Sequence, residues 1–275
     1  MTYYIKCTLK NKKKEARGIF SCTFNFDRKR IRELRPGRFV MVWLPGIDEF
    51  PLSPSNYDPE TCTVRLTFKV RGIGTQTLSA INVGDAIFIR GPYGNGFKVP
   101  RELAKENDKP VLIAGGGVGL APLMPLIKDL LHRNIKLHVI CGFRSFDEAF
   151  FIDEIADLLE NNFTISTDDG SMGIKGTVVD VAKELLRRKT FSYVYACGPE
   201  IMLFKLHKML LNKRVPHQML VERYIKCALG VCGSCIINGF RLCKEGPVFN
   251  DVKLKKMKEF GRYKRNASGV RELIS

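Results

Sequence analysis

Apolar and polar positions alternate along the first 100 residues in the manner of β-strands. Between residues 64 and 70 every second side chain is apolar, which is the pattern of a strand with one buried face. Pro-Gly pairs at 36–37 and 45–46 separate such segments, as turns do. We expect strands at Tyr3–Leu9, Ile19–Phe26, Phe39–Leu44, Thr63–Val70 and Ala86–Arg90. Residues 1–100 therefore predict a small antiparallel β barrel.

The pattern changes after Pro100. Short apolar runs now alternate with longer segments of helical periodicity. The expected strands are Val111–Ala114, Leu137–Cys141, Phe163–Ser166 and Tyr193–Ala196, and the expected helices are Leu120–Arg133, Phe150–Asn161, Val178–Arg188 and Glu200–Asn212. Strands that alternate with helices indicate a parallel α/β sheet, which we assign to residues 101–217. Residues 218–275 break this rhythm, so we expect them to form a third, smaller module.

The composition fits a packed protein, but its charge is unusual. Of the 275 residues, 45% are hydrophobic and 27% are charged, and the net charge is +17. Basic clusters lie at 12–14, 28–30, 253–258 and 262–265. Such a surface can bind nucleic acid, an anionic ligand or an acidic protein. Because the clusters are not interleaved with aromatic residues as in nucleic-acid-binding modules, we expect anionic ligands and solvated faces, and no nucleic-acid partner.

The sequence also bears on location in the cell. The first residues lack the apolar core of a signal peptide. The uncharged stretch from 111 to 127 contains four Gly and two Pro and is shorter than the roughly 20 residues of a membrane-spanning helix. Nine cysteines without a secretory signal indicate a reducing compartment. We therefore expect a cytoplasmic protein with no membrane span.

Four of the cysteines are clustered near the C-terminus. They have the spacing C-x4-C-x2-C-x7-C, formed by Cys227, Cys232, Cys235 and Cys243. A C-x4-C-x2-C run with a more distant fourth cysteine is the spacing of plant-type [2Fe–2S] ferredoxins. The glycines within the run allow a loop to wrap around a cluster. A structural zinc site, which usually uses two close pairs of ligands, and buried free cysteines are the alternatives.

A glycine-rich turn, Gly115–Gly119, joins an expected strand to an expected helix. Such a turn lets backbone amides and the positive end of a helix approach a pyrophosphate. It lacks the last glycine of a full G-x-G-x-x-G motif, and no acidic residue ends the second strand. Polar or glycine-rich segments also follow the third and fourth strands, at 167–171 and 197–200. Because ligands of open α/β sheets bind at the carboxyl ends of strands, these loops together favour a nucleotide site over simple turns.

The expected barrel contains three further candidate segments. Pro51-Leu52-Ser53 is expected in a loop after a strand, and glycine-rich turns are expected at 72–75 and 91–97. These turns could admit a phosphate or a flat ring, although hairpin turns explain them equally well.

Together these segments resemble the ferredoxin reductase superfamily, in which an FAD-binding barrel precedes a nicotinamide-binding α/β domain. Within it, the chain is most similar to the electron-transfer subunits of dihydroorotate dehydrogenases. The matching stretches are 72–78, 90–97, 114–125, 167–176, 197–202 and 227–243, followed by Gly246-Pro247-Val248-Phe249. The resemblance covers nearly the whole chain.

The resemblance implies three cofactors: FAD, NAD(H) and a [2Fe–2S] cluster. FAD would contact Pro51, Leu52, Ser53, Thr67, Phe68, Lys69, Gly74 and Thr75. The nicotinamide nucleotide would lie near Gly116, Gly117, Gly119, Cys197 and Gly198. The four clustered cysteines would bind the iron. The chain departs from the family at Phe50, where an arginine usually contacts the FAD phosphate, and Arg71 or Arg38 could replace it. Arg144 and Lys175 leave NADP open as an alternative to NAD.

The resemblance also implies a partner and a reaction. An FMN-containing dihydroorotate dehydrogenase catalytic subunit would oxidise dihydroorotate in pyrimidine biosynthesis, and the two chains would form a heterotetramer. Electrons would pass through the cluster and FAD to NAD⁺. The same motifs also resemble the flavin subunits of cytoplasmic hydrogenases and of ferredoxin:NADP reductases. A stand-alone reductase or redox sensor, and a basic zinc-bearing nucleic-acid-binding protein, are the remaining alternatives.

Overall fold

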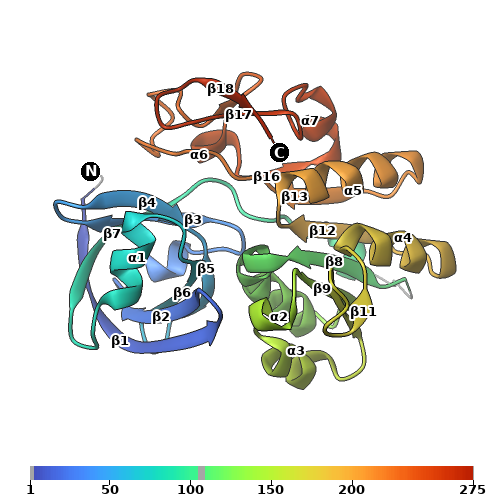
Figure 1. Ribbon diagram of the computed structural model, residues 1–275, viewed down its shortest axis with the longest axis horizontal. Coiled ribbons are helices and arrows are strands. Elements are labelled where there is room, and N and C mark those ends of the chain that lie inside the picture. The colour runs from blue at the N-terminus through green and yellow to red at the C-terminus, as the bar shows by residue number, and fades with distance from the viewer. Residues whose placement is uncertain (1–2, 105–108, 275) are drawn as a thin grey trace.

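The computed structural model describes residues 3–104 and 109–274. Figure 1 shows three parts: the N-terminal strands, the α/β layers and the C-terminal segment above both. The first part contains β1 (Ile5–Ala16), β2 (Ile19–Asn25), the 3-10 turn η1 (Ile31–Glu33), β3 (Phe39–Leu44), β4 (Asp48–Leu52), β5 (Pro54–Asp58), β6 (Thr63–Lys69), α1 (Ile73–Ala80) and β7 (Ala86–Tyr93).

These strands form one antiparallel sheet in the order β4-β3-β7-β1-β2-β6-β5. Its two edge strands, β4 and β5, are consecutive and only Ser53 separates them. The edges of the sheet therefore meet, and the sheet wraps into a barrel (Figure 1). The predicted antiparallel barrel and its five strands are confirmed; the first strand extends to Ala16 instead of Leu9, and the other ends differ by at most a few residues.

The sequence pattern did not predict β4, β5 or α1. Pro51-Leu52-Ser53 was expected in a loop after a strand, and this was wrong because Pro51 and Leu52 belong to β4. Proline is tolerated in edge strands, where a missing N–H breaks no ladder, and β4 and β5 are the two edges. Helix α1 begins directly after Gly72, so the expected glycine-rich turn at 72–75 is the first turn of a helix.

The second part of the chain forms the α/β layers. It contains η2 (Arg101–Ala104), β8 (Val111–Gly116), η3 (Gly117–Leu123), α2 (Met124–His132), β9 (Leu137–Phe143), η4 (Phe146–Glu148), α3 (Ile152–Leu159), β10 (Phe163–Thr167), β11 (Ile174–Lys175), α4 (Val178–Arg188), β12 (Tyr193–Cys197), α5 (Glu200–Asn212) and β13 (His217–Leu220). The expected helix at Leu120–Arg133 starts as the 3-10 turn η3, which contains Pro122, and becomes α-helical from Met124.

The C-terminal part contains β14 (Ile236–Ile237), β15 (Phe240–Arg241), α6 (Leu242–Glu245), β16 (Val248–Asn250), α7 (Asp251–Lys256), β17 (Tyr263–Arg265) and β18 (Arg271–Leu273). Strand β16 pairs antiparallel with β13 at the edge of the α/β sheet, whose order is β11-β10-β9-β8-β12-β13-β16. The sheet is therefore parallel as predicted except for this last strand, which residues 218–275 supply.

The two faces of this sheet bury different helices. Leu112 of β8 lies in one core with side chains of α4 and α5, whereas Val111 and Ile113 lie in another with side chains of α2 and α3. This alternation follows from the two-residue period of a strand.

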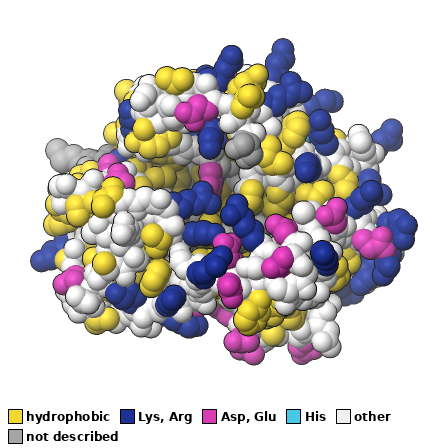
Figure 2. Space-filling model, in the orientation of Figure 1, with side chains coloured by type: hydrophobic (Ala, Val, Ile, Leu, Met, Phe, Trp, Pro, Cys, Tyr) yellow, Lys and Arg dark blue, Asp and Glu magenta, His cyan; other side chains and the backbone are white. Residues whose placement is uncertain are grey.

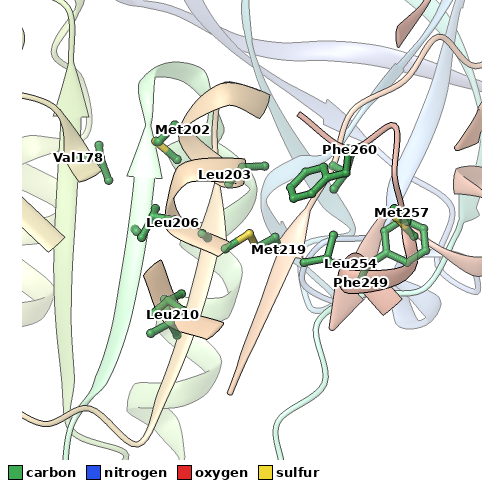
Figure 3. Packing of buried hydrophobic residues seen from close by; sticks show 14 of the residues in the cluster. Val178, Met202, Leu203, Leu206, Leu210, Met219, Phe249, Leu254, Met257 and Phe260 are labelled. Atoms are coloured by element: carbon green, nitrogen blue, oxygen red, sulfur yellow. The ribbon is translucent and has the colours of Figure 1, made fainter. Parts of the chain in front are cut away.

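The C-terminal segment packs on the same side as α5. Figure 3 shows Leu203 and Leu206 of α5 and Met219 of β13 near Leu254 and Phe260. The same buried cluster includes Cys235 and Cys243. The cysteine-bearing segment therefore shares its core with the α/β layers. In the described part of the chain, no helix is long and apolar enough to cross a membrane.

Candidate functional site: a cavity beside a four-cysteine loop

A cavity of about 330 Å³ lies where the barrel, the glycine-rich turn and the C-terminal segment meet. Figure 2 looks into this hollow, whose floor is hydrophobic and whose lower rim carries Lys and Arg side chains. All eight residues predicted to contact FAD line it: Pro51, Leu52, Ser53, Thr67, Phe68, Lys69, Gly74 and Thr75. Residues from three separate segments of the barrel, 51–53, 67–69 and 74–75, are thus brought to one place.

The remaining lining residues were not among the predicted FAD contacts, although Arg71 was a candidate for the flavin phosphate and Gly72 lay in an expected glycine-rich turn. They are Phe39, Asp48, Phe50, Arg71, Gly72, Val118, Pro122, Leu220, Val221, Glu222, Arg223, Ile225, Leu242 and Pro247. Val118 and Pro122 belong to η3, so the α/β part supplies one wall. Residues 220–225 supply another wall, and this segment runs directly into Cys227. The position of this segment between the last parallel strand and the cysteine run was the feature of the sequence that could have identified it as part of the site.

The first turn of α1 gives the cavity a site suited to an anion. Gly72, Gly74 and Thr75 line the cavity, and the first N–H groups of a helix have no partner within the helix. The Thr75 hydroxyl accepts hydrogen bonds from the N–H groups of Arg71 (2.9 Å) and Gly72 (3.2 Å). A Cβ at Gly74 would lie 2.6 Å from Asp48 and Phe50 side-chain atoms, so only glycine fits there. This is the arrangement in which helix N-termini bind phosphates.

Three basic side chains line the cavity, and two of them are held in ion pairs. Lys69 forms an ion pair with Glu148 at 2.7 Å, and Arg223 forms one with Glu200. Arg71 is exposed, and among residues 3–104 and 109–274 no ion pair holds its guanidinium. Arg71 is therefore the cation of the cavity that is available to a ligand.

Arg38, the other candidate for the flavin phosphate, does not line this cavity. Its guanidinium donates to the carbonyl oxygens of Glu33 (2.8 Å) and Pro92 (2.9 Å). It lines a separate hollow beside Cys243, so the structure favours Arg71 over Arg38.

Glu222 adds a carboxylate to the cavity wall. The side chain reaches solvent, yet the protein around it desolvates the carboxyl and raises its pKa, and the charge of Arg71 opposes this shift.

The five residues predicted near the nicotinamide come together at the ends of β8 and β12. A Cβ at Gly119 would lie 2.6 Å from the backbone of Gly198, and one at Gly116 would lie 2.6 Å from the sulfur of Met202. Gly117 has a φ of +52° with open space around it. The glycines therefore allow two turns to pack backbone against backbone, next to Val118 of the cavity. Cys197 is buried, and this burial raises the pKa of its thiol well above the ordinary value, so it is a neutral thiol.

Three of the clustered cysteines lie in the loop 227–235, and the fourth, Cys243, lies on α6. The Sγ atoms of Cys235 and Cys243 are 3.4 Å apart. The Sγ of Cys227 accepts N–H groups from Leu229 (3.4 Å) and from Cys232 (3.5 Å). Gly230 and Gly233, with φ of +79° and +75°, allow the loop to turn between these ligands.

The protonation of these thiols follows from their surroundings. Burial acts to raise the pKa of Cys227, but N–H groups of Cys232, Leu229 and Val231 outweigh it and lower the pKa to about 6. Burial and the neighbouring Cys235 raise the pKa of Cys243 to about 12. Within the described ranges, no three His, Cys, Asp or Glu side chains converge on a point as the ligands of one metal ion do. The donor set of four thiols, with amides directed at one sulfur, fits an iron–sulfur cluster.

Comparisons with known proteins agree with this site. The domain family described as the iron-sulfur cluster binding domain of dihydroorotate dehydrogenase B matches residues 222–255. The relative from Methanothermobacter thermautotrophicus is 38% identical over 251 residues, which are 90% of each chain. The relative from Pyrococcus horikoshii is 40% identical over 268 residues, which are 96% of each chain. Both are named "Probable dihydroorotate dehydrogenase B (NAD(+)), electron transfer subunit".

Solved structures show the same fold. An NADH-dependent reduced ferredoxin-NADP oxidoreductase superposes with a TM-score of 0.77 at 30% identity, over 90% of this chain and 88% of that one. Phthalate dioxygenase reductase, at 20% identity and a TM-score of 0.59 over 75% of this chain and 64% of that one, shares the fold alone. The predicted fold class, a barrel followed by a nicotinamide-type α/β domain with a C-terminal iron–sulfur region, is confirmed. The chain belongs to the family of dihydroorotate dehydrogenase B electron transfer subunits.

Proposed function

We propose that this chain carries electrons from a dihydroorotate-oxidising catalytic subunit to NAD⁺. FAD would occupy the cavity, and a [2Fe–2S] cluster would be held by Cys227, Cys232, Cys235 and Cys243. The observation that supports this most strongly is the convergence of all eight predicted flavin residues on one cavity. One wall of that cavity continues directly into the cysteine loop, so the two cofactor sites are neighbours.

The cavity residues have separate tasks in this proposal. Phe50, Pro51 and Leu52 offer an apolar surface to the flat flavin ring, and the hydroxyls of Ser53 and Thr67 offer hydrogen bonds. The first turn of α1 and the uncommitted Arg71 offer positive charge to the pyrophosphate. When bound, FAD supplies the chemistry that connects single-electron carriers with the two-electron acceptor NAD⁺.

The turns that end β8 and β12 are suited to hold the nicotinamide nucleotide against this cavity. Gly116, Gly117 and Gly119 have no side chains that would cover the backbone. Cys197 and Gly198, at the end of β12, lie against this turn. A buried neutral thiol at Cys197 adds no charge to this site. We assign no proton transfer to any of these side chains.

We divide the chain by these tasks into residues 1–100 for FAD, 101–217 for the nicotinamide nucleotide and 218–275 for the cluster; strand β13 (His217–Leu220) spans the last boundary. Since the relatives are named as subunits, a catalytic partner chain completes the enzyme. We propose that the partner contains FMN and that two copies of each chain form a heterotetramer. The exposed Leu229 and Val231 beside Cys232 place apolar side chains where such a partner would approach the cluster.

The deciding experiment is dihydroorotate-dependent reduction of NAD⁺ by this chain co-purified with its FMN-containing partner. Turnover should disappear in Cys232→Ser and persist in Cys62→Ser, because Cys62 is a free cysteine at the distant turn between β5 and β6. Both variants should bind FAD equally. A flavin-loaded complex of both chains that shows no turnover would contradict the dihydroorotate assignment.

A second candidate function is supported by the similarity to the ferredoxin-NADP oxidoreductase structure. In that case the chain would retain the same cofactor sites and exchange electrons with ferredoxin. Reduction of ferredoxin by NADH or NADPH, without any response to dihydroorotate, would identify this alternative.

A further inference from the structure

Arg90 is a buried arginine at the junction between the barrel and the cysteine loop. It lies on β7, and its side chain is only 8% exposed. Its Nε and one Nη donate to the two carboxylate oxygens of Glu49, at 2.5 and 3.0 Å. The remaining N–H groups donate to the Tyr93 hydroxyl (3.3 Å) and to the carbonyl oxygens of Cys227 (2.7 Å) and Lys226 (3.1 Å). All five N–H donors of the guanidinium therefore have an acceptor.

These partners belong to two different parts of the molecule. Glu49 lies on β4 directly before Phe50, Pro51 and Leu52, which line the cavity. Cys227 is the first cysteine of the C-x4-C-x2-C run. A single side chain thus connects the strand beneath the flavin cavity with the backbone of a cluster ligand. Because electron tunnelling weakens steeply with distance, a side chain that connects the two cofactor sites helps to fix their separation.

The Arg90 side chain also brings a positive charge to this junction. An arginine stays protonated in proteins, and here Glu49 and Tyr93 raise the pKa of Arg90 against the opposing effect of burial. Its positive charge therefore lies against the backbone of Cys227, with the compensating carboxylate of Glu49 on the Nε edge of the guanidinium. Net charge and hydrogen bonds around an iron–sulfur centre set its reduction potential. Reduction adds negative charge, which a nearby cation stabilises.

We propose that Arg90 is a positioning residue that anchors the cysteine loop to the flavin-binding strand and, together with Glu49, sets the reduction potential of the cluster. This inference rests on the proposed function only in requiring an iron–sulfur cluster in the four-cysteine loop. Arg90 and Glu49, neither of which binds the cluster, should shift its reduction potential in opposite directions.

The test is a redox titration of the purified chain, with the cluster followed by electron paramagnetic resonance. Arg90→Gln removes the cation and should lower the midpoint potential of the cluster. Glu49→Gln removes the anion and should raise it. Arg90→Lys keeps the charge and should shift the potential least. Arg65→Gln is the matched control, because Arg65 also forms a half-buried ion pair, with Glu154 at 2.9 Å, but at the interface of the barrel with α3, and it should leave the potential unchanged.

Hydrogen exchange separates the anchoring role from the electrostatic one. The ammonium of Arg90→Lys has only three donors on a single atom, so it cannot hold Glu49 and both carbonyls together. Amides of residues 226–233 should exchange about tenfold faster in Arg90→Lys than in the wild-type chain. The same amides should be unaffected in Arg65→Gln.

The outcomes separate the role of Arg90 from the presence of the cluster. If the wild-type chain carries a cluster and the two Gln variants shift its potential in the same direction, or not at all, the inference is wrong. If Arg90→Gln does not fold, the rise in Glu49→Gln and the exchange rates in Arg90→Lys still decide it. A wild-type chain that is purified under anaerobic conditions and reconstituted with iron and sulfide, yet shows no cluster signal, would instead contradict the proposed function.

Discussion

Arg223 and Glu200 form a bidentate ion pair that connects the cysteine-bearing segment to the first turn of α5. Both Nη atoms of Arg223 donate to the Glu200 carboxylate, and the two side chains are 2% and 11% exposed. Glu200 also accepts the N–H of Gly261 at 2.8 Å, and Arg223 donates to the carbonyl oxygen of Tyr263 at 3.1 Å. The pair therefore joins three chain segments that meet beside the cavity.

Breaking this pair should destabilise the whole protein. Removing one partner leaves an uncompensated buried charge, which costs about 3–5 kcal/mol. We expect Glu200→Gln to lower the free energy of unfolding by that amount in urea denaturation. The matched control is Glu184→Gln, whose partners Arg187 and Arg188 are 75% and 70% exposed, and exposed pairs contribute less than about 1 kcal/mol. Equal effects of the two variants would show that the buried pair has no special role.

Two buried histidines should make stability depend on pH. His207 Nδ1 and His217 Nε2 are 2.8 Å apart, between α5 and β13. Burial, with a smaller contribution from His217, lowers the pKa of His207 to about 4, although Asp251 of α7 opposes this. Burial also lowers the pKa of His217, against Asp251 and the carbonyl oxygen of Val215. The ring of Phe260 completes the surroundings of His207.

The sign of the pH effect follows from these shifts. An unfolded histidine titrates near about 6.5, whereas folded His207 titrates near about 4. Between these values the unfolded chain binds more protons, so the free energy of unfolding falls as the pH falls. The histidine contribution is complete above about pH 6.5, and we expect a loss of about 2–3 kcal/mol by pH 4.5. Urea denaturation at pH 7.0 and 4.5 measures it: His207→Asn should reduce the loss, and the exposed His132→Asn should not.

The sequence predicted several of the regular helices and strands well, because the periodicity that identifies them is local. The helices Val178–Arg188 and Glu200–Asn212 and the strand Phe39–Leu44 have the predicted bounds, since their periodicity is uninterrupted. Strands β4 and β5 escaped prediction because Pro51 and Pro54 mark loops in most sequence contexts, and only their place at the sheet edges makes them strands.

The site was predictable where its residues form short motifs. The barrel segments at 51–53, 67–69 and 74–75 could be assigned to one ligand by resemblance, and the structure brings them together. The wall formed by residues 220–225 was not predicted: its position before the cysteine run was a signal, but its contact with the cavity depends on how three separate parts of the chain pack. The role of Arg90 was hidden for the same reason: its partners Glu49 and Cys227 lie 41 and 137 residues away.

Gly119 should be needed for the packing of the two turns at the nicotinamide site. A Cβ there would lie 2.6 Å from backbone atoms of Gly198, and backbone cannot move aside as a flexible side chain can. We expect Gly119→Ala to lower the free energy of unfolding by about 1–3 kcal/mol and to weaken NADH binding about tenfold, which corresponds to about 1.4 kcal/mol. Calorimetric titration with NADH measures the second effect.

Gly117→Ala separates steric conflict from backbone strain at the same turn. Gly117 has a φ of +52° and open space around it, so alanine there meets only the cost of the left-handed conformation, roughly 1–2 kcal/mol. We expect it to retain more NADH affinity than Gly119→Ala. The opposite order would mean that the turn-to-turn contact is not what holds the site.

Thr67 should link flavin binding to the stability of the barrel. Its hydroxyl lies 2.7 Å from that of Ser21 on β2 and 2.7 Å from that of Ser55 on β5, and all three side chains are buried. Because Thr67 also lines the cavity, Thr67→Val leaves the two serines without their shared partner and removes a polar group facing the ligand. We expect a loss of about 1–3 kcal/mol in the unfolding free energy of the FAD-free chain and weaker FAD binding. Thr67→Ser keeps the hydroxyl and should retain both properties. Fluorescence titration with FAD distinguishes the two variants. Equal affinities would show that the hydroxyls of Ser21, Ser55 and Thr67 stabilise the barrel without contacting the flavin.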